Sequence, residues 1–213
     1  MKLLTIVCAW LVYGAVHSLL ASTAAKAWVA RRRPDLMPIY RLAFNAFATI
    51  ALLPVLWLVY GTESDWLWRL TGAWAWLSNG LALAAVAGFA VTARAYDMDE
   101  FLGLRQLRQN DRGTDDREGF TLSYLHRFVR HPWYFLGLVL VWTRDMNGPL
   151  LVSAVAITLY FIIGSRFEER KLVALHGDAY RKYLAKVPGL LPLPWRHLTR
   201  AEADELVQRP RHR

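Results

Sequence analysis

The amino-acid sequence predicts an all-α fold: a polytopic membrane bundle of about five transmembrane helices with a C-terminal helical hairpin and a cytoplasmic tail. Of the 213 residues, 55% are hydrophobic and ten are tryptophan. Residues 3–25, 42–62 and 70–93 contain no Asp, Glu, Lys or Arg. Each run is at least as long as the roughly 20 residues that a helix needs to cross the hydrocarbon core. These runs predict three transmembrane helices.

Two further apolar runs, at 131–143 and 146–165, predict a helical hairpin whose first arm is short. The turn between the two arms is Arg144-Asp145-Met146-Asn147-Gly148-Pro149, which is rich in helix breakers. The chain is therefore expected to have four consecutive parts. They are a three-helix membrane portion (1–95), a cytoplasmic loop (96–129), the hairpin with its tail (130–195) and a basic C-terminal tail (196–213).

The basic residues predict the orientation in the membrane. Of the 26 Lys and Arg, only Lys2, Arg69 and Arg144 fall outside the segments 26–41, 94–130 and 166–213. Because basic residues near helix ends stay on the cytoplasmic side, the N-terminus is expected outside the inner membrane and the C-terminus in the cytoplasm. The net charge of +9 then reflects topology and contact with anionic lipids, and no nucleic-acid partner is expected. A cleaved signal peptide is rejected because Arg31, Arg32 and Arg33 follow the first apolar run instead of preceding it.

Few polar residues lie inside the apolar runs. Cys8 is the only cysteine, which excludes an internal disulfide and a zinc–thiolate site, and no metal is expected. His17, Asn45 and Asn79 are candidates for function, because polar groups at membrane depth are costly. They can also form hydrogen bonds between helices. For Asn79 the packing role is favoured, whereas for His17 both roles stay open.

The cytoplasmic segments contain the residues suited to chemistry. Arg130 and His131 precede the short hairpin arm, and Glu168 and Glu169 follow the long one. An arginine can bind a carboxylate, a carboxylate can bind an ammonium, and aromatic faces attract a sulfonium. S-adenosylmethionine carries all three groups. Composition alone favours the simpler alternative, in which these residues form structural ion pairs at helix ends.

A composite motif then resembles a known family. Its parts are Val129-Arg130-His131-Pro132-Trp133-Tyr134 with Gly137, then Glu168-Glu169-Arg170-Lys171-Leu172, and Gly177-Asp178-Ala179-Tyr180-Arg181-Lys182-Tyr183 with Val187-Pro188 and Leu191-Pro192. Over about residues 124–194 this order resembles the isoprenylcysteine carboxyl methyltransferase superfamily. Three upstream segments are similar to a narrower bacterial branch, the methanethiol S-methyltransferases and NnrU-like membrane proteins. They are His17-Ser18-Leu19-Leu20-Ala21-Ser22, Tyr40-Arg41-Leu42-Ala43-Phe44-Asn45 and Phe101-Leu102-Gly103-Leu104-Arg105-Gln106.

The resemblance implies a small helical bundle whose last hairpin and tail enclose S-adenosylmethionine at the cytoplasmic face. By position, the implied cofactor-binding residues are Arg130, His131, Pro132, Tyr134, Gly137, Glu168, Glu169, Tyr180 and Tyr183. Glu169 would also approach the acceptor. His126 departs from the family pattern just before the motif, and the sequence gives no role for it or for the tail after Trp195.

The implied function is methyl transfer to a small thiol, because the N-terminal half resembles the thiol-methylating branch. His17 and Gln106 lie in that half and are expected on the acceptor side. An isoprenoid carboxylate or a lipid amine is an alternative acceptor. A sterol-reductase-like oxidoreductase, which shares an Arg-His-Pro-x-Tyr step, and a non-catalytic NnrU-like protein are alternative functions. The expected partners are a small-molecule or lipid acceptor and the membrane lipids, while the sequence is silent on oligomeric state.

Overall fold

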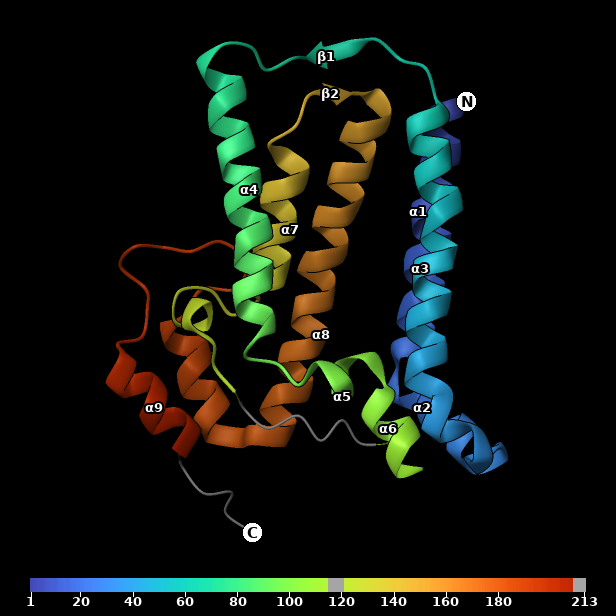
Figure 1. Cartoon of the computed structure of the whole chain (residues 1–213), viewed down its shortest axis with the longest axis vertical. Helices are drawn as coiled ribbons and strands as arrows, with labels where there is room; N and C mark the ends of the chain where they lie inside the picture. The colour runs from blue at the N-terminus through green and yellow to red at the C-terminus, as the bar shows by residue number, and fades with distance from the viewer. Residues whose placement is uncertain (115–120, 209–213) are drawn as a thin grey trace. The chain divides into compact units, whose positions relative to one another are not determined.

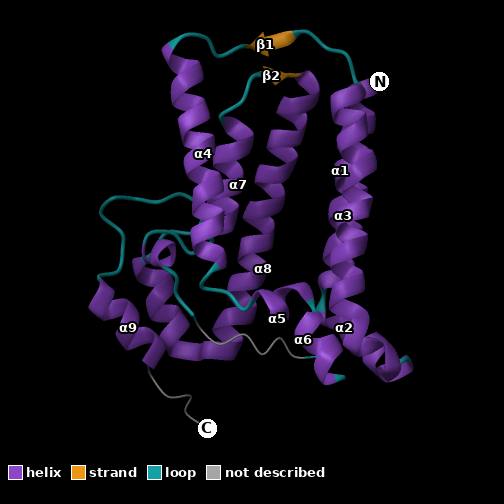
Figure 2. Cartoon of the chain, viewed as in Figure 1, coloured by secondary structure: helices purple, strands orange, loops and turns teal. Residues whose placement is uncertain are grey.

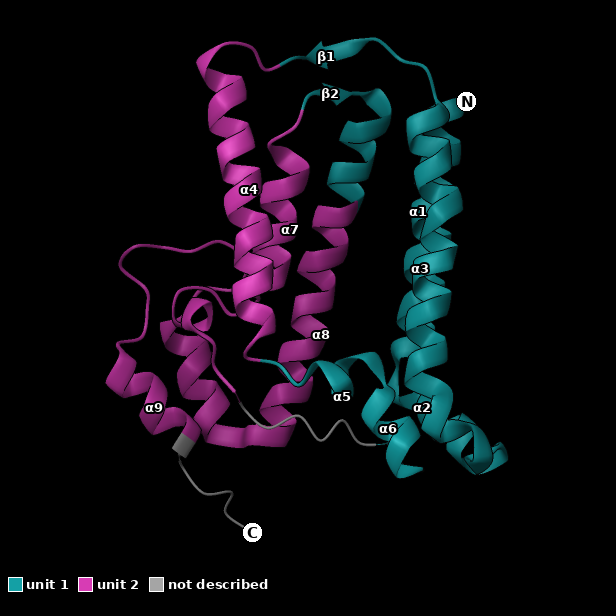
Figure 3. Ribbon diagram, in the orientation of Figure 1, with its two compact units in different colours: residues 1–69, 96–117, 145–156 teal, residues 70–95, 118–144, 157–213 magenta. Residues whose placement is uncertain are grey.

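The computed structural model describes residues 1–114 and 121–208, which are mostly helical (Figures 1 and 2). The chain forms two compact units (Figure 3). Unit 1 comprises Met1–Arg69, Tyr96–Arg117 and Asp145–Ala156, and unit 2 comprises Leu70–Ala95, Glu118–Arg144 and Ile157–Arg213. Each unit contains part of the expected N-terminal portion 1–95. The units are assembled from segments that are not consecutive in the sequence, unlike the four expected parts. Residues 115–120 of the expected cytoplasmic loop and residues 209–213 of the expected basic tail lie outside the described residues.

Four helical segments of the described chain are long and apolar enough to cross a membrane. They are α1 (Lys2–Ala21), η1 with α3 (Pro34–Leu36 and Met37–Gly61), α4 (Ala73–Ala93) and α8 (Gly148–Lys186). The shorter apolar helix α7 (Pro132–Trp142) is the expected short arm of the hairpin. These five helices coincide with the five apolar runs, which confirms an all-α, multi-pass membrane protein.

In unit 1, α1 packs along α3. The Tyr40 hydroxyl donates to the Leu20 carbonyl at 2.7 Å and ties the end of α1 to the start of α3. The next helix, α2 (Thr23–Arg32), begins where Ser22 accepts a hydrogen bond from the Ala25 amide at 3.1 Å, an ordinary N-cap. At the other end of α3, the short strand β1 (Trp66–Trp68) pairs antiparallel with β2 (Met146–Asn147).

A turn between α5 (Met98–Leu102) and α6 (Leu104–Gln109) lies directly on α3 in unit 1. Gly103 makes this possible, because a Cβ there would lie 2.6 Å from the Leu42 amide nitrogen and φ is +91°. Both the contact and the left-handed backbone require glycine. Asn45 donates to the carbonyls of Phe101 and Leu102 at 3.0 and 3.2 Å and holds the turn in place.

In unit 2, α4 packs against α7. The Trp133 indole donates to the Thr92 hydroxyl at 2.9 Å, and Gly88 lets Leu136 approach α4. At the far end of α7, Arg144 donates to the Asn79 side chain at 3.0 Å. Asn79 therefore accepts a hydrogen bond that ties α4 to the residues after α7, which is the packing role expected for it.

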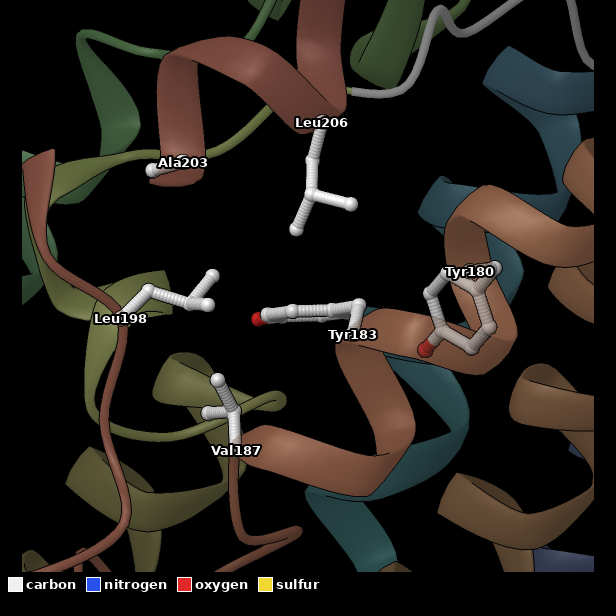
Figure 4. Close-up of a cluster of buried hydrophobic side chains, with 6 residues drawn as sticks. All are labelled: Tyr180, Tyr183, Val187, Leu198, Ala203 and Leu206. Atoms are coloured by element: carbon white, nitrogen blue, oxygen red, sulfur yellow. The ribbon is translucent and has the colours of Figure 1, made fainter. Parts of the chain in front are cut away.

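The helix α8 is bent at Gly177, where φ is +55° and ψ is −128°. After this bend, Tyr180, Tyr183 and Val187 pack with Leu198 and with helix α9 (Arg200–Gln208) (Figure 4). The α9 helix begins with a capping box, in which Thr199 and Glu202 form reciprocal hydrogen bonds. This cluster is the apolar core of the tail in unit 2.

Candidate active site

The backbone before α7 is fixed by the loop that follows α8. A 3-10 turn, η2 (Tyr124–Arg127), leads into the motif. The Arg130 amide donates to the Pro188 carbonyl at 2.8 Å, and the His131 amide donates to the Gly189 carbonyl at 3.1 Å. Pro132 occupies the first position of α7, where a missing N–H costs nothing. These two hydrogen bonds hold the backbone of Arg130 and His131 against the loop after α8, which is far away in the sequence.

Their side chains meet the two glutamates of α8. Arg130 Nε donates to Glu169 Oε1 at 2.7 Å, and His131 Nε2 lies 3.0 Å from the same oxygen. The other ring nitrogen of His131 lies 3.4 Å from Glu168 Oε2. With His131 protonated, the two cations balance the two carboxylates. The structure thus brings together four residues that the motif predicted as one site.

The guanidinium of Arg130 also has backbone partners. Its Nη1 donates to the carbonyls of Leu184, at 3.2 Å, and Val187. Within the described residues no hydrogen bond involves Nη2, and a Cβ at Gly189 would lie 3.3 Å from Nη2 and 4.0 Å from Glu169 Oε1. Gly189 therefore packs closely against the Arg130 guanidinium, and a side chain there would crowd Nη2.

The charges in the cluster shift the titration of its members. Burial opposes protonation of His131, but hydrogen bonds with Glu168 and Glu169 outweigh it and raise the His131 pKa. Glu169 follows the last apolar turn of α8. Its burial opposes ionisation, but hydrogen bonds with His131 and Arg130 outweigh that effect and lower the Glu169 pKa. Both shifts favour the charged form of the residue concerned.

An aromatic stack continues from the charged cluster into the hairpin. The rings of His131 and Tyr134 lie 5.3 Å apart with planes 10° apart, and those of Tyr134 and Phe161 lie 4.5 Å apart with planes 6° apart. The Tyr134 hydroxyl donates to Glu168 Oε2 at 3.2 Å. Gly137 lies beside this stack, since a Cβ there would come within 3.2 Å of the Phe161 ring.

Tyr180 and Tyr183 lie in the tail core and not over an open cleft (Figure 4). Each is at most 2% exposed. The Tyr183 hydroxyl donates to the His126 carbonyl at 2.7 Å. Burial and the nearby charges of Glu169 and Glu168 raise the pKa of Tyr180, so it stays a neutral phenol. His126 is itself buried and bonded to Ser123, which makes it part of the turn that leads to Arg130.

The three upstream motifs gather in unit 1. The His17 ring lies 5.0 Å from Phe44 of α3. Arg41 and Gln106 both donate to the Glu100 carbonyl, at 3.0 and 3.3 Å. The buried Oε1 of Gln106 has no hydrogen-bond partner among the described residues. The structure thus joins Gln106 to α3 through a shared carbonyl and packs His17 on α3 through Phe44.

Two features around the charged cluster were not predicted from the sequence. Phe161 lies seven residues before Glu168, the spacing of one helical face, which was the available signal. The carbonyls of Pro188 and Gly189 act through the backbone, so no residue type could have revealed them.

The fold and the site define an all-α, multi-pass membrane protein with a charged cluster at one end of a helical hairpin. The sequence is 33% identical to methanethiol S-methyltransferase of Mycobacterium tuberculosis over 87% of this chain and 76% of the relative. It is also 33% identical to methanethiol S-methyltransferase 2 of Bradyrhizobium diazoefficiens, over 83% of this chain and 68% of that relative. The chain belongs to the methanethiol S-methyltransferase family. Neither a protein-family model nor a solved structure matches it.

Proposed function

We propose that this chain is an S-adenosylmethionine-dependent methyltransferase that methylates a small thiol, such as methanethiol, at the cytoplasmic face of the inner membrane. Its similarity to proteins named methanethiol S-methyltransferase supports the reaction class. The observation that carries the cofactor assignment is the charge-balanced cluster of Arg130, His131, Glu168 and Glu169.

The residues of the cluster fit a zwitterionic cofactor. Arg130 Nη2 is available to bind a carboxylate beside Gly189. The Glu168 side chain is 47% exposed and can accept from an ammonium, while the Tyr134 hydroxyl holds it in place. Tyr180 and Tyr183 would support this site by packing the bent end of α8.

When bound, S-adenosylmethionine supplies an electrophilic methyl group on a sulfonium. The task of the protein is then to align the acceptor and exclude water, which requires little covalent help. A thiol has a free pKa near 8.5, and a neighbouring cation favours its thiolate. Arg130 holds such a positive charge in the cluster.

On the acceptor side we propose His17 and Gln106, with Glu169 next to the reacting groups. Gln106 fits this role because its buried Oε1 has unused hydrogen-bonding capacity. His17 fits it as a partly buried imidazole within the apolar helix α1.

The test is methyl transfer by the purified protein in detergent. Labelled S-adenosylmethionine is supplied with methanethiol, an isoprenoid carboxylate, a lipid amine or no acceptor. We expect label in the product of methanethiol. Binding of a nicotinamide cofactor in place of S-adenosylmethionine would instead indicate a reductase, and cofactor binding without turnover would indicate a non-catalytic protein.

A further inference from the structure

Unit 2 contains an apolar groove of about 470 Å³ between α7, α8 and the loop after α8. This volume lies within the range of about 300–1,000 Å³ that is usual for small-molecule sites. The side chains that matter below are Phe135, Val139, Trp142, Ile162, Leu190 and Leu191.

The groove adjoins the charged cluster at three places. Phe135 is one helical turn beyond His131 and donates its amide to the His131 carbonyl at 3.0 Å. Leu190 directly follows Gly189, whose carbonyl accepts from the His131 amide. Ile162 directly follows Phe161, which stacks on Tyr134. One end of the groove therefore lies next to the backbone that carries His131.

The polar side chains that line the groove already have hydrogen-bond partners. The Trp142 indole donates to the Thr158 hydroxyl at 2.9 Å, which links the two helices across the groove. The Thr143 hydroxyl donates to the Val139 carbonyl at 2.6 Å. Since these groups are bonded to each other or to the backbone, the walls favour a hydrocarbon occupant over a polar one.

Methanethiol is far too small to fill this space. Its two heavy atoms need about 60 Å³ if each takes the share of one water molecule in the liquid, about 30 Å³. On that scale the groove has room for on the order of ten further carbons. We propose that the groove binds the alkyl chain of the acceptor, so that the substrates of this protein include straight-chain alkanethiols as well as methanethiol. This inference rests on the proposed methyltransferase function.

The chemistry is the same for each thiol. The thiol first loses its proton, either to solvent or to His17 if that imidazole acts as the base. The thiolate sulfur then forms a bond to the methyl carbon with its own electron pair, while the bond between that carbon and the sulfonium sulfur breaks. The breaking bond leaves its electron pair on the departing thioether, and no oxidant or reductant is needed.

The test compares methanethiol, butanethiol and octanethiol as acceptors at saturating S-adenosylmethionine. Each methylene that enters the groove should raise kcat/KM by up to roughly fourfold. Val139→Trp fills the groove and should lower the octanethiol-to-methanethiol ratio of kcat/KM at least tenfold, whereas Val139→Ala should preserve or raise it. Ile162→Trp, on the opposite wall, serves as the second filling variant if Val139→Trp does not fold.

A matched control is available in unit 1. There, α1 and α3 line a second apolar cavity, of about 440 Å³, which includes Ala51. Ala51→Trp fills it with the same side chain and should leave the ratio unchanged. As a readout independent of turnover, calorimetry should show that octyl methyl sulfide binds wild type and Ala51→Trp alike, and Val139→Trp at least tenfold more weakly.

The outcomes separate the two proposals. Absence of methyl transfer to any thiol would contradict the proposed function. Methylation of methanethiol alone, with octyl methyl sulfide unbound, would overturn the alkyl-chain inference and leave the groove to membrane lipid. An equal change of the ratio in Val139→Trp and Ala51→Trp would also overturn it.

Discussion

Arg130 Nε donates to Glu169 Oε1 at 2.7 Å and joins the segment before α7 to the helix α8. The two side chains are only 14% and 16% exposed. Removing one partner of such a pair leaves an uncompensated charge, which destabilises the fold as well as any bound ligand. Loss of cofactor binding in Arg130→Ala or Glu169→Ala is therefore informative only when stability is measured alongside it.

At Glu168 a loss of cofactor binding can be separated from a loss of stability, because its side chain is 47% exposed. We expect Glu168→Ala to weaken S-adenosylmethionine binding roughly tenfold, the loss of one charge-assisted contact of about 1.5 kcal/mol. Its melting temperature should stay near that of wild type, whereas Arg130→Ala and Glu169→Ala should lower both affinity and melting temperature. Calorimetry and thermal unfolding measure the two quantities.

The control is Asp178→Ala, which removes an 85% exposed carboxylate from the same helix. It should change neither quantity. If cofactor affinity were unchanged in all three cluster variants, the cluster would not be the cofactor site.

His126 should make the stability of unit 2 depend on pH. Burial, with a smaller contribution from the charge of His131, lowers the pKa of His126 to about 4. Because the folded-state pKa is below the unfolded value of about 6.5, its stabilising contribution is complete above pH 6.5 and is lost as pH falls towards 4. The contribution is on the order of 3 kcal/mol. His126→Asn should flatten the decline in melting temperature between these pH values.

The exposed His197 gives the control, since His197→Asn should keep the wild-type slope. His131 acts in the opposite sense, because its folded-state pKa is raised. Its contribution is complete below about pH 6.5 and is lost as pH rises through the folded value. An unchanged slope in His126→Asn would show that His126 is not the titrating group.

Gly137 should be intolerant of a methyl group because of the aromatic stack. A Cβ there would lie 3.2 Å from the Phe161 ring, which is stacked on Tyr134. Gly137→Ala should destabilise the protein by about 1–3 kcal/mol, the usual cost of overpacking. Gly164→Ala is the matched change on α8, where a Cβ would lie 3.9 Å from the Tyr134 hydroxyl, an ordinary contact. Equal denaturant midpoints for the two variants would contradict this account.

Much of this architecture could be predicted from residue types. The charge-free runs predicted the five apolar helices. The motif predicted that Arg130, His131, Glu168 and Glu169 lie close together. Their pairing was foreseen as the structural alternative, and the ion pairs are present. α8 bends at Gly177, the residue with which the third part of the motif begins.

The remaining features depend on contacts that leave no sequence pattern. The backbone hydrogen bonds from Arg130 and His131 to the loop after α8 involve no side chain on either partner. The fit of Gly103 against Leu42 depends on a distance between two helices that only the fold sets. Tyr180 and Tyr183 belong to the motif, but their burial depends on α9, which the motif does not include.

The topology can be tested with reporter fusions. Because 23 of the 26 basic residues lie in segments assigned to the inside, a fusion after Arg213 should report a cytoplasmic location. A fusion within residues 61–65, between α3 and β1, should report the periplasm. Finding both reporters on the same side would contradict a chain that crosses the membrane five times.

The acceptor side can be tested at two positions in unit 1. We expect His17→Ala and Gln106→Ala to reduce methyl transfer to the thiol about tenfold or more while cofactor affinity stays near wild type. Such a split is the pattern of a lost acceptor contact. Tyr13→Phe is the control in α1, because it keeps the ring next to His17 and removes only a hydroxyl bonded to the Ala48 carbonyl.

His17→Asn then distinguishes two roles for the imidazole. Asparagine can donate and accept hydrogen bonds but takes no proton at neutral pH. If His17 only positions the acceptor, His17→Asn should retain most activity; if it removes the thiol proton, His17→Asn should resemble His17→Ala and flatten the pH profile of kcat/KM. Wild-type turnover in His17→Ala, His17→Asn and Gln106→Ala would show that His17 only packs on Phe44 of α3, and it would remove unit 1 from acceptor recognition.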